Sequence, residues 1–273
     1  MEYDEKIISL YKKNNITYIK FKILEKYKNI EHGFCIDKCL NFRTKDKFGN
    51  FYNKNINNYK IFLNLFNLNY NNAIKPIFKH TNNYKIVTKK YNNNKPDFNI
   101  HNYYATDALI TNKKNFILTS TSADCNIILV YDPINNAIAN IHSGWRGTLN
   151  KIIVNTINGM IKEYNTNPKD LICCICPSIK LCHFEVSDDL YMQFKDKIPN
   201  QKYYKYINNK WHIDLTNIII DNLIDLNIKK ENIIDSNICT MCNSNIMHSY
   251  RADNINSGLN MGFICLKGDN YDR

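Results

Sequence analysis

A succession of short apolar segments between residues 105 and 143 constrains the fold more than any other feature of this chain. Four of these segments are rich in aliphatic and β-branched side chains and are separated by Asn, Asp and Pro: residues 108–110, 117–119, 126–131 and 137–141. Apolar runs of this length, bounded by turn-forming residues, are typical of buried β-strands. We therefore expect four adjacent strands of one sheet.

A helix is expected directly after these strands. Residues 149–164 carry apolar side chains at the three- and four-residue spacing of one helix face. The same kind of spacing predicts three further helices, over residues 57–68, 188–195 and 215–226. Apolar runs predict four more strands, over residues 84–88, 171–175, 233–238 and 261–266. Because no repeat or linker interrupts the 273 residues, a mixed α/β sandwich in a single domain, residues 1–273, is the simplest architecture.

The composition argues against nucleic-acid and membrane partners. The net charge is +11, but the 36 Lys and Arg are spread along the chain, whereas nucleic-acid-binding proteins gather basic residues on one face or helix. No segment approaches the roughly 20 apolar residues that span a bilayer, and no secretory leader is recognisable. We expect a cytoplasmic protein whose ten cysteines are reduced.

Cys125 and His142 form the first candidate site. Cys125 stands at the head of the 126–131 strand and His142 at the end of the next one, with only the turn 132–136 between these strands. In an antiparallel hairpin these two ends lie side by side. A thiolate and an imidazole on rigid strands are good zinc ligands. Two other interpretations stay open: a buried thiol beside a core histidine, and a cysteine nucleophile with His142 as its base.

A catalytic zinc ion needs a third protein ligand. His80, which precedes the 84–88 strand, is the candidate. Three protein ligands with an open fourth position describe a catalytic zinc site, whereas four protein ligands close a structural site. A zinc ion bound by His80, Cys125 and His142 would therefore be catalytic rather than structural.

Residues 144–147 (GWRG) form a candidate anion site because they lead into the 149–164 helix. Backbone N–H groups at a helix start and the guanidinium of Arg146 suit an anion such as phosphate. The alternative is that Trp145 packs in the core and Arg146 is solvated.

Further cysteines raise the question of a second zinc site. They are, with one adjacent histidine, Cys173, Cys174, Cys176, Cys182, His183, Cys239 and Cys242. The spacing Cys239-x-x-Cys242 suits half of such a site. However, successive residues of a strand face opposite sides, so Cys173 and Cys174 cannot both reach one ion. We expect these cysteines to be buried free thiols that bind no metal.

Several segments occur in the order found in a known family. Residues 121–125 (TSADC) and 141–147 (IHSGWRG) match its two signature blocks, and residues 105–111 (ATDALIT) match the strand before them. Five downstream segments also match: 176–179 (CPSI), 184–186 (FEV), 212–215 (HIDL), 239–240 (CT) and 249–251 (SYR). The chain resembles the zinc-dependent purine nucleoside phosphorylases with adenosine deaminase activity once called multicopper polyphenol oxidases or laccase-domain proteins. The family-like core covers about residues 72–268, and residues 1–71 are diverged.

The resemblance implies a fold, a metal and a reaction. The fold would be a mixed α/β sandwich shared with some cysteine hydrolases, and the zinc ligands would be His80, Cys125 and His142. The enzyme would cleave adenosine, inosine or guanosine with phosphate to the free base and ribose 1-phosphate. Adenosine deamination would be a second activity of the same site. The partners would thus be a purine nucleoside and phosphate.

Four more residues are candidates for the chemistry. Arg146 and Arg251 would position phosphate. For deamination, a zinc-activated water needs a proton shuttle, and Glu185 and Asp124 are the candidates. A multicopper oxidase needs many clustered His ligands, which the seven His of this chain do not supply.

The chain departs from the family pattern at four positions. The family usually has Gln at the position of Phe78, Gly at Cys176, Tyr at Phe184 and Arg at Leu259. A lost Gln and a lost Arg put the substrate range in question more than metal binding. Two alternatives therefore remain: a cysteine-dependent hydrolase using Cys125 and His142, and a zinc-stabilised binding protein with impaired catalysis.

Overall fold

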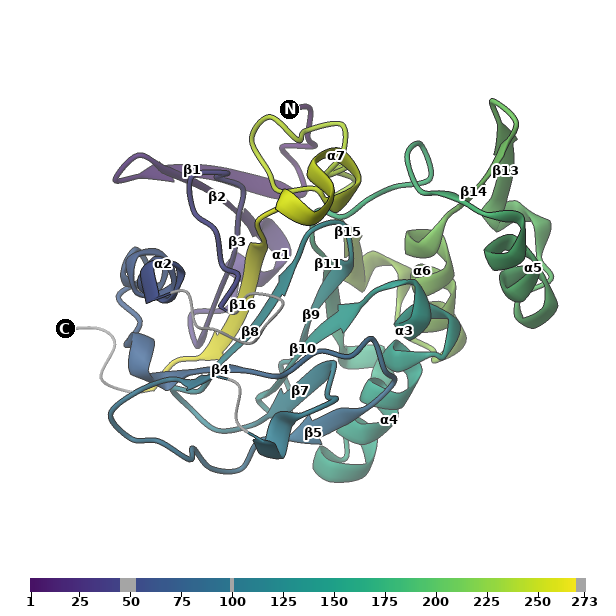
Figure 1. Ribbon diagram of the computed structural model, residues 1–273. Coiled ribbons are helices and arrows are strands. Elements are labelled where there is room, and N and C mark those ends of the chain that lie inside the picture. Colours follow the sequence, from purple (N-terminus) through teal and green to yellow (C-terminus); the bar gives the residue numbers. More distant parts are fainter. Residues whose placement is uncertain (45–52, 99–100, 269–273) are drawn as a thin grey trace.

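Two β-sheets packed face to face form the centre of the fold (Figure 1). The structure is a computed structural model that describes residues 1–44, 53–98 and 101–268. The seven-stranded sheet has the order β1-β2-β3-β16-β8-β4-β6, and the six-stranded sheet has the order β15-β11-β9-β10-β7-β5. A small third sheet has the order β12-β14-β13.

The elements have the following bounds. The strands of the seven-stranded sheet are β1 (Ile8–Lys13), β2 (Ile16–Phe21), β3 (Ile30–Cys35), β4 (Ala73–Lys75), β6 (Asp97–Phe98), β8 (Ile117–Ser122) and β16 (Asn260–Leu266). Those of the six-stranded sheet are β5 (Tyr84–Ile86), β7 (Ala108–Thr111), β9 (Asn126–Asp132), β10 (Ala137–Ser143), β11 (Ile172–Ile175) and β15 (Ile233–Asp235). The small sheet consists of β12 (Glu185–Val186), β13 (Tyr204–Ile207) and β14 (Lys210–Ile213). The α-helices are α1 (Lys22–Glu25), α2 (Asn53–Asn64), α3 (Trp145–Leu149), α4 (Ile152–Tyr164), α5 (Asp188–Lys197), α6 (Leu215–Asp225) and α7 (Tyr250–Asp253). Short 3-10 helices are η1 (Tyr70–Asn72), η2 (His101–Tyr103), η3 (Pro168–Asp170), η4 (Gln201–Tyr203), η5 (Lys230–Asn232) and η6 (Asn254–Asn256).

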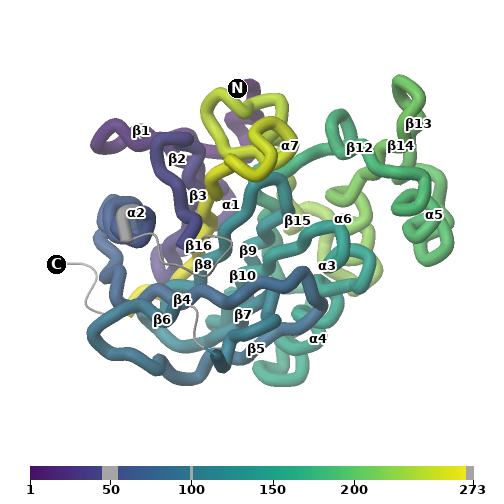
Figure 2. The backbone as a smooth tube through the Cα atoms, in the orientation of Figure 1, coloured from purple at the N-terminus to yellow at the C-terminus, as the bar shows by residue number. Residues whose placement is uncertain are grey.

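Helices cover the outer faces of the two large sheets, which gives four layers (Figure 2). The alternation of β9 shows why: Ile127 and Leu129 point into the core between the sheets, whereas Ile128 and Val130 pack against the core under α4 and α6. Residues of α2 cover the outer face of the other sheet. The layers confirm the mixed α/β sandwich expected from the sequence.

The predicted elements after residue 105 are present, with one correction. The predicted strands correspond to β7, β8, β9 and β10, and the predicted helix over 149–164 corresponds to α4. However, β8 does not join the other three strands in one sheet, because it pairs with β16 and β4 in the seven-stranded sheet. Its Leu118 packs in the core between the two sheets and its Ile117 in the core under α2, and an apolar run carries no sign of which sheet it joins.

The β9–β10 hairpin is the element that positions the candidate site. Its register pairs His142 with Ile127 and Ser143 with Asn126, so Cys125 lies one residue beyond the paired end. The Asp132 carboxylate closes the turn by accepting hydrogen bonds from the backbone N–H groups of Ile134 and Asn135, at 3.0 Å each. The expected hairpin is confirmed.

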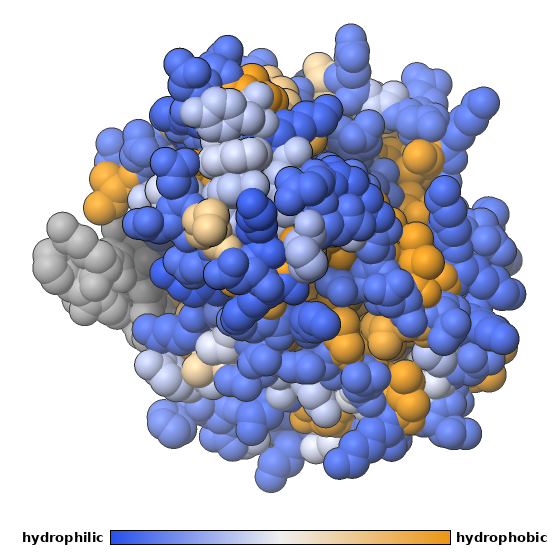
Figure 3. All heavy atoms as spheres, turned by 90° about the vertical axis from the view of Figure 1, so that its right-hand side faces the viewer, coloured by the Kyte–Doolittle hydropathy of each residue, from blue (hydrophilic) through white to orange (hydrophobic). Residues whose placement is uncertain are grey.

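Helix α5 and strands β12 to β14 form a satellite at the right-hand side of Figure 1. They share a small separate core with α3 and α6, to which Tyr191, Phe194 and Ile213 contribute. Figure 3 views the molecule from this side, where hydrophilic side chains dominate and hydrophobic ones show between them. None of the helices in the described ranges is long and apolar enough to cross a membrane.

Candidate metal centre and its cavity

The structure brings His80, Cys125 and His142 together. One ligand atom from each of them lies within 4.8 Å of the others. His142 is buried at the end of β10, Cys125 is partly exposed just before β9, and His80 is exposed. Two imidazoles and one thiolate are donors that zinc prefers, and three protein ligands leave a coordination position for water or substrate. The donor set therefore fits a catalytic zinc ion.

Asp107, just before β7, holds the two histidines in place. Its buried carboxylate contacts Nδ1 of His142 at 3.0 Å and accepts a hydrogen bond from the backbone N–H of His80 at 3.1 Å. Its other oxygen accepts from the backbone N–H of Thr81 at 2.8 Å. A proton on Nδ1 of His142 leaves Nε2 free to bind a metal. These contacts explain how a segment with a left-handed residue, His80 at φ 56°, keeps one conformation.

The electrostatics of the pair favour a charged Cys125. Burial alone would raise the pKa of the Cys125 thiol, but the charge and hydrogen bond of His142, together with those of His80, outweigh burial and lower it. Burial likewise acts to lower the pKa of His142, but the Cys125 thiolate and the hydrogen bond to Asp107 raise it. A thiolate is the form in which cysteine binds a metal or attacks a substrate.

Gly144 allows His80 and Cys125 to approach each other. A Cβ at this position would lie 2.8 Å from Cδ2 of His80 and 3.0 Å from Sγ of Cys125. Its φ of −76° is accessible to any residue, so contact distance alone requires glycine.

Replacing Gly144 by Ala is therefore expected to push the two ligands apart and to weaken zinc binding by about tenfold or more. Competition with a chelating dye measures the affinity. Gly147→Ala is the control, because its Cβ would come no closer than 3.2 Å to a neighbouring atom. Equal zinc affinity of Gly144→Ala and the wild type would contradict this account.

A cavity of about 760 Å³ opens beside the cluster. Its wall includes all three arginines of the described residues, Arg43, Arg146 and Arg251. Among the described residues, hydrogen bonds engage the guanidinium groups of Arg43 and Arg251, whereas the exposed guanidinium of Arg146 makes none and stacks on the Trp145 ring at 4.0 Å. The expected turn around Arg146 is in fact the start of the short helix α3, which Gly144 precedes.

Asp124 lies in the wall but its carboxylate is already bonded. One oxygen accepts from the Thr240 hydroxyl at 2.6 Å and the other from the backbone N–H of Arg251 at 2.7 Å. Its φ of 89° marks the sharp change of direction between β8 and β9. Asp124 thus ties three segments together beside Cys125.

Glu185 and Arg251 face the same cavity from neighbouring segments. The guanidinium of Arg251 donates to the backbone carbonyls of His183 and Glu185, at 2.9 Å each. A hydrogen bond from Lys210 lowers the pKa of the Glu185 carboxyl, which keeps it ionised at neutral pH. Its side chain is 41% exposed, so it is accessible to solvent.

Three of the four family departures lie at the cavity as well. Phe78, in place of the usual Gln, packs its ring 4.6 Å from that of His142, and Leu259 lines the wall where the family usually has Arg. Phe184 is also in the wall, whereas Cys176 is fully buried in the core between the sheets.

Sequence reasoning missed two residues of this region, Asp107 and Arg43. Asp107 lies within the matching segment 105–111, and a lone Asp just before a buried strand was the available signal. Arg43 lies far in the sequence from the other residues of the site and reaches the cavity only through the tertiary fold, so no local pattern marks it.

The remaining cysteines divide into two groups. Cys173 and Cys174 point to opposite faces of β11, as predicted, and are buried in different cores. The sequence predicts that the six cysteines between residues 173 and 242 are buried. This prediction is wrong for Cys182 and Cys242, which are exposed. Both lie in loops outside the strands, where the alternation argument does not apply.

A family model described as multi-copper polyphenol oxidoreductase laccase matches residues 40–267. The chain belongs to this family. A relative from Bacteroides thetaiotaomicron named purine nucleoside phosphorylase is 33% identical over 186 residues, which cover 67% of this chain and 69% of the relative. A second protein of that name, from Clostridium acetobutylicum, is 34% identical over 162 residues, which cover 59% of this chain and 67% of the relative.

A solved structure has the same fold. The hypothetical protein YfiH of Bacillus licheniformis superposes with a TM-score of 0.82 at 23% identity, over 92% of this chain and 96% of that protein. The family expected from the sequence is confirmed, and its matched region extends closer to the N-terminus than the predicted core.

Proposed function

We propose that this protein is a zinc-dependent purine nucleoside phosphorylase that cleaves adenosine, inosine or guanosine with phosphate. The main observation behind the proposal is the convergence of a zinc-type donor set and all three described arginines on one cavity. Arginine binds phosphate in a bidentate way that lysine does not reproduce. In a chain whose other basic residues are mostly lysines on the surface, this placement favours a phosphate substrate. The names of two relatives support the same reaction.

The size and lining of the cavity suit the substrates. A volume of about 760 Å³ lies within the range of small-molecule sites, roughly 300–1,000 Å³. The rings of Phe78, Trp145 and Phe184 give apolar walls on which a purine base can stack. Arg146, whose exposed guanidinium makes no hydrogen bond within the described residues, is the residue we assign to phosphate.

The reaction transfers a ribosyl group from the base to phosphate. A phosphate oxygen forms a bond to the anomeric carbon while the bond from that carbon to the purine nitrogen breaks, and the base takes the bonding electrons and a proton. Arg146 would hold the phosphate close to the anomeric carbon, which lowers the entropic part of the barrier. The aromatic walls would hold the departing base and exclude water from the sugar.

The metal would be held by His80, Cys125 and His142. When bound, zinc supplies a Lewis acid and lowers the pKa of a bound water, which is the chemistry that adenosine deamination requires. The ionised Glu185 carboxylate is the residue we assign to accept a proton in that second activity. Asp124 instead acts as a positioning residue, because both its oxygens are bonded within the protein.

A cysteine hydrolase is the second candidate, favoured by one specific contact. Asp107 orients His142, and His142 lies beside Cys125, in the order of a Cys-His-Asp triad. Zinc ligation would occupy the thiolate, so the two functions exclude each other. Hydrolytic activity that rises when zinc is removed and disappears on alkylation of Cys125 would favour this candidate.

The Arg146→Ala variant tests the phosphorylase assignment. Its zinc content and folding should match those of the wild type, because the side chain is exposed and makes no hydrogen bond in the described structure. Loss of a charge-assisted contact of about 1.5–3 kcal/mol should raise the phosphate concentration for half-maximal rate by roughly 10- to 150-fold. The measurement is release of adenine and hypoxanthine from adenosine and inosine at several phosphate concentrations, separated by chromatography.

Two further variants make this test sharper. Arg146→Lys keeps the charge but loses the bidentate geometry, so its effect should be intermediate. Lys162→Ala removes an exposed cation on α4, away from the cavity, and should behave as the wild type. Base release that does not depend on phosphate would reject the phosphorylase. Conversion of adenosine to inosine without any base release would leave deamination as the function, and no turnover with tight nucleoside binding would indicate the zinc-stabilised binding protein.

A further inference from the structure

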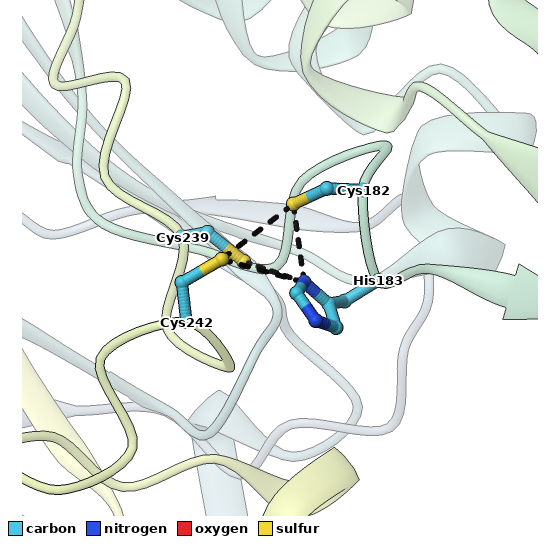
Figure 4. A group of neighbouring side chains, drawn as sticks. All are labelled: Cys182, His183, Cys239 and Cys242. Atoms are coloured by element: carbon cyan, nitrogen blue, oxygen red, sulfur yellow. Dashed lines mark hydrogen bonds between the residues drawn. The ribbon is translucent and has the colours of Figure 1, made fainter.

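A second cluster of metal-type ligands lies outside the cavity. Cys182, His183, Cys239 and Cys242 come from two loops far apart in the sequence, one between β11 and β12 and one between β15 and α7 (Figure 4). Their four ligand atoms lie within 4.8 Å of one another. Figure 4 shows the three sulfur atoms and the His183 ring turned toward a common centre.

The spacing of these atoms fits a single tetrahedral ion. Zinc–sulfur bonds of about 2.3 Å and zinc–nitrogen bonds of about 2.0–2.1 Å place two sulfur ligands about 3.8 Å apart and a sulfur and a nitrogen about 3.6 Å apart. The Sγ atoms of Cys182 and Cys242 are 3.8 Å apart. The Nδ1 atom of His183 lies 3.2 Å from Sγ of Cys182, 3.4 Å from that of Cys242 and 3.9 Å from that of Cys239.

Backbone hydrogen bonds hold the two loops in this arrangement. Cys239 forms a parallel β-bridge with Ser178, and the N–H of Thr240 donates to the Ser178 carbonyl at 3.1 Å. Within the second loop, the N–H of Asn243 donates to the carbonyl of Cys239 at 3.2 Å, which turns the chain between Cys239 and Cys242. The ligands are therefore preorganised by contacts that do not involve their side chains.

We propose that Cys182, His183, Cys239 and Cys242 bind one structural zinc ion. Three thiolates and one imidazole form a complete tetrahedral ligand set of the Cys3His type, with no position left for a substrate. The soft thiolates favour zinc over the hard cations Mg²⁺ and Ca²⁺. Because Cys182 and Cys242 are exposed, apolar burial does not explain why three thiols and an imidazole converge here.

The zinc ion would hold together two loops that are connected to the wall of the cavity. The carbonyl of His183 accepts a hydrogen bond from Arg251, and His183 is followed directly by Phe184 and Glu185 of the wall. On the other loop, Thr240 lies between two of the ligands and donates its hydroxyl hydrogen to Asp124. Loss of the ion should loosen both loops and lower the stability of the protein, while the cluster of His80, Cys125 and His142 keeps its own zinc.

A disulfide is the competing explanation for the short sulfur distances. Oxidation of Cys182 and Cys242 would consume two thiols and remove two of the four ligands. Thiol titration of the denatured, unreduced protein separates the two cases: zinc binding leaves all ten cysteines titratable, and a disulfide lowers the count by two.

The decisive experiment counts zinc in purified variants. The wild type should contain two zinc ions per chain, and Cys239→Ser with Cys242→Ser should contain one. This double variant should also unfold at a temperature roughly 5–10 °C lower than the wild type. Cys39→Ser is the matched control, because Cys39 is exposed and lies outside both clusters. It should keep both zinc ions and the wild-type unfolding temperature.

Cobalt substitution covers the case in which the double variant does not fold. In the Cys125→Ala, His142→Ala variant, Co²⁺ should give the visible bands of a tetrahedral ion and the strong near-ultraviolet absorption of several thiolate ligands. A zinc content of zero in that variant, with no thiolate absorption from Co²⁺, would overturn the structural site but not the proposed catalytic one. The structural site would also be overturned, and the catalytic one retained, if the Cys239→Ser, Cys242→Ser variant kept one zinc ion and the Cys125→Ala, His142→Ala variant kept none.

Discussion

The Cys125→Ala, His142→Ala variant is expected to lose one zinc ion per chain and most of its nucleoside-cleaving and deaminating activity. The two residues supply two of the three ligands in the cluster, and His80 alone does not hold zinc against water. Metal ions contribute several kcal/mol to transition-state stabilisation, so turnover should fall by about 10²- to 10⁴-fold. Elemental analysis gives the zinc content, and chromatography of the products gives the rates.

The control for this variant removes one cysteine and one histidine elsewhere. Cys39 and His101 are both exposed and belong to neither cluster, so Cys39→Ser with His101→Ala should keep the zinc content and the activity of the wild type. Far-ultraviolet circular dichroism of both variants checks that the fold is retained. Full zinc stoichiometry in the Cys125→Ala, His142→Ala variant would remove this cluster as a metal site.

The local part of the candidate site could be predicted from the sequence because it lies within one hairpin. The strands that position Cys125 and His142 are joined by the short turn 133–136, and antiparallel pairing then fixes which strand ends meet. Short apolar runs separated by Asn, Asp and Pro likewise located the central strands. These runs do not indicate to which sheet each strand belongs. The prediction for β8, which joins the seven-stranded sheet, is therefore wrong.

The non-local part of the site was beyond the reach of pattern reasoning. His80 joins the cluster because the buried Asp107 accepts hydrogen bonds from its segment, and such a contact leaves no periodic signal. The residue pattern offers His80 only as a candidate, and the family resemblance is what assigns it as a ligand. The second cluster shows the same limit: the bridge between Ser178 and Cys239 brings together two loops about 60 residues apart, and the alternation of β11 says nothing about them.

The N-terminal strands were missed for a different reason. Strand β1 exposes most of its residues at the edge of the seven-stranded sheet, and its sequence mixes lysines with isoleucine and leucine. Strand β2 buries residues on both faces, so it shows no clean alternation. Period-two reasoning requires one buried and one solvated face, and neither strand provides them.

Asp107 provides the strongest test of how the histidines are held, because both its oxygens accept hydrogen bonds. The Asp107→Asn variant replaces one of these acceptors by an NH2 donor. In one amide orientation the NH2 group faces the backbone N–H of Thr81, and two donors then oppose each other. In the other orientation it faces His142, favours a proton on Nε2 and so blocks the nitrogen that would bind zinc.

We expect Asp107→Asn to lower zinc affinity by about 10- to 100-fold, the usual effect of losing a group that orients a metal ligand. A buried donor without an acceptor should also lower the free energy of unfolding by about 1–3 kcal/mol. Asp132→Asn is the matched control. Asp132 is equally buried at the far end of β9 and also accepts backbone N–H groups, so its variant should lose similar stability. Zinc affinity should remain unchanged in the control, because Asp132 contacts no residue of the cluster. Zinc titration and urea unfolding of both variants therefore separate the two effects: equal zinc affinity in Asp107→Asn and Asp132→Asn would mean that Asp107 stabilises the fold without orienting the ligands.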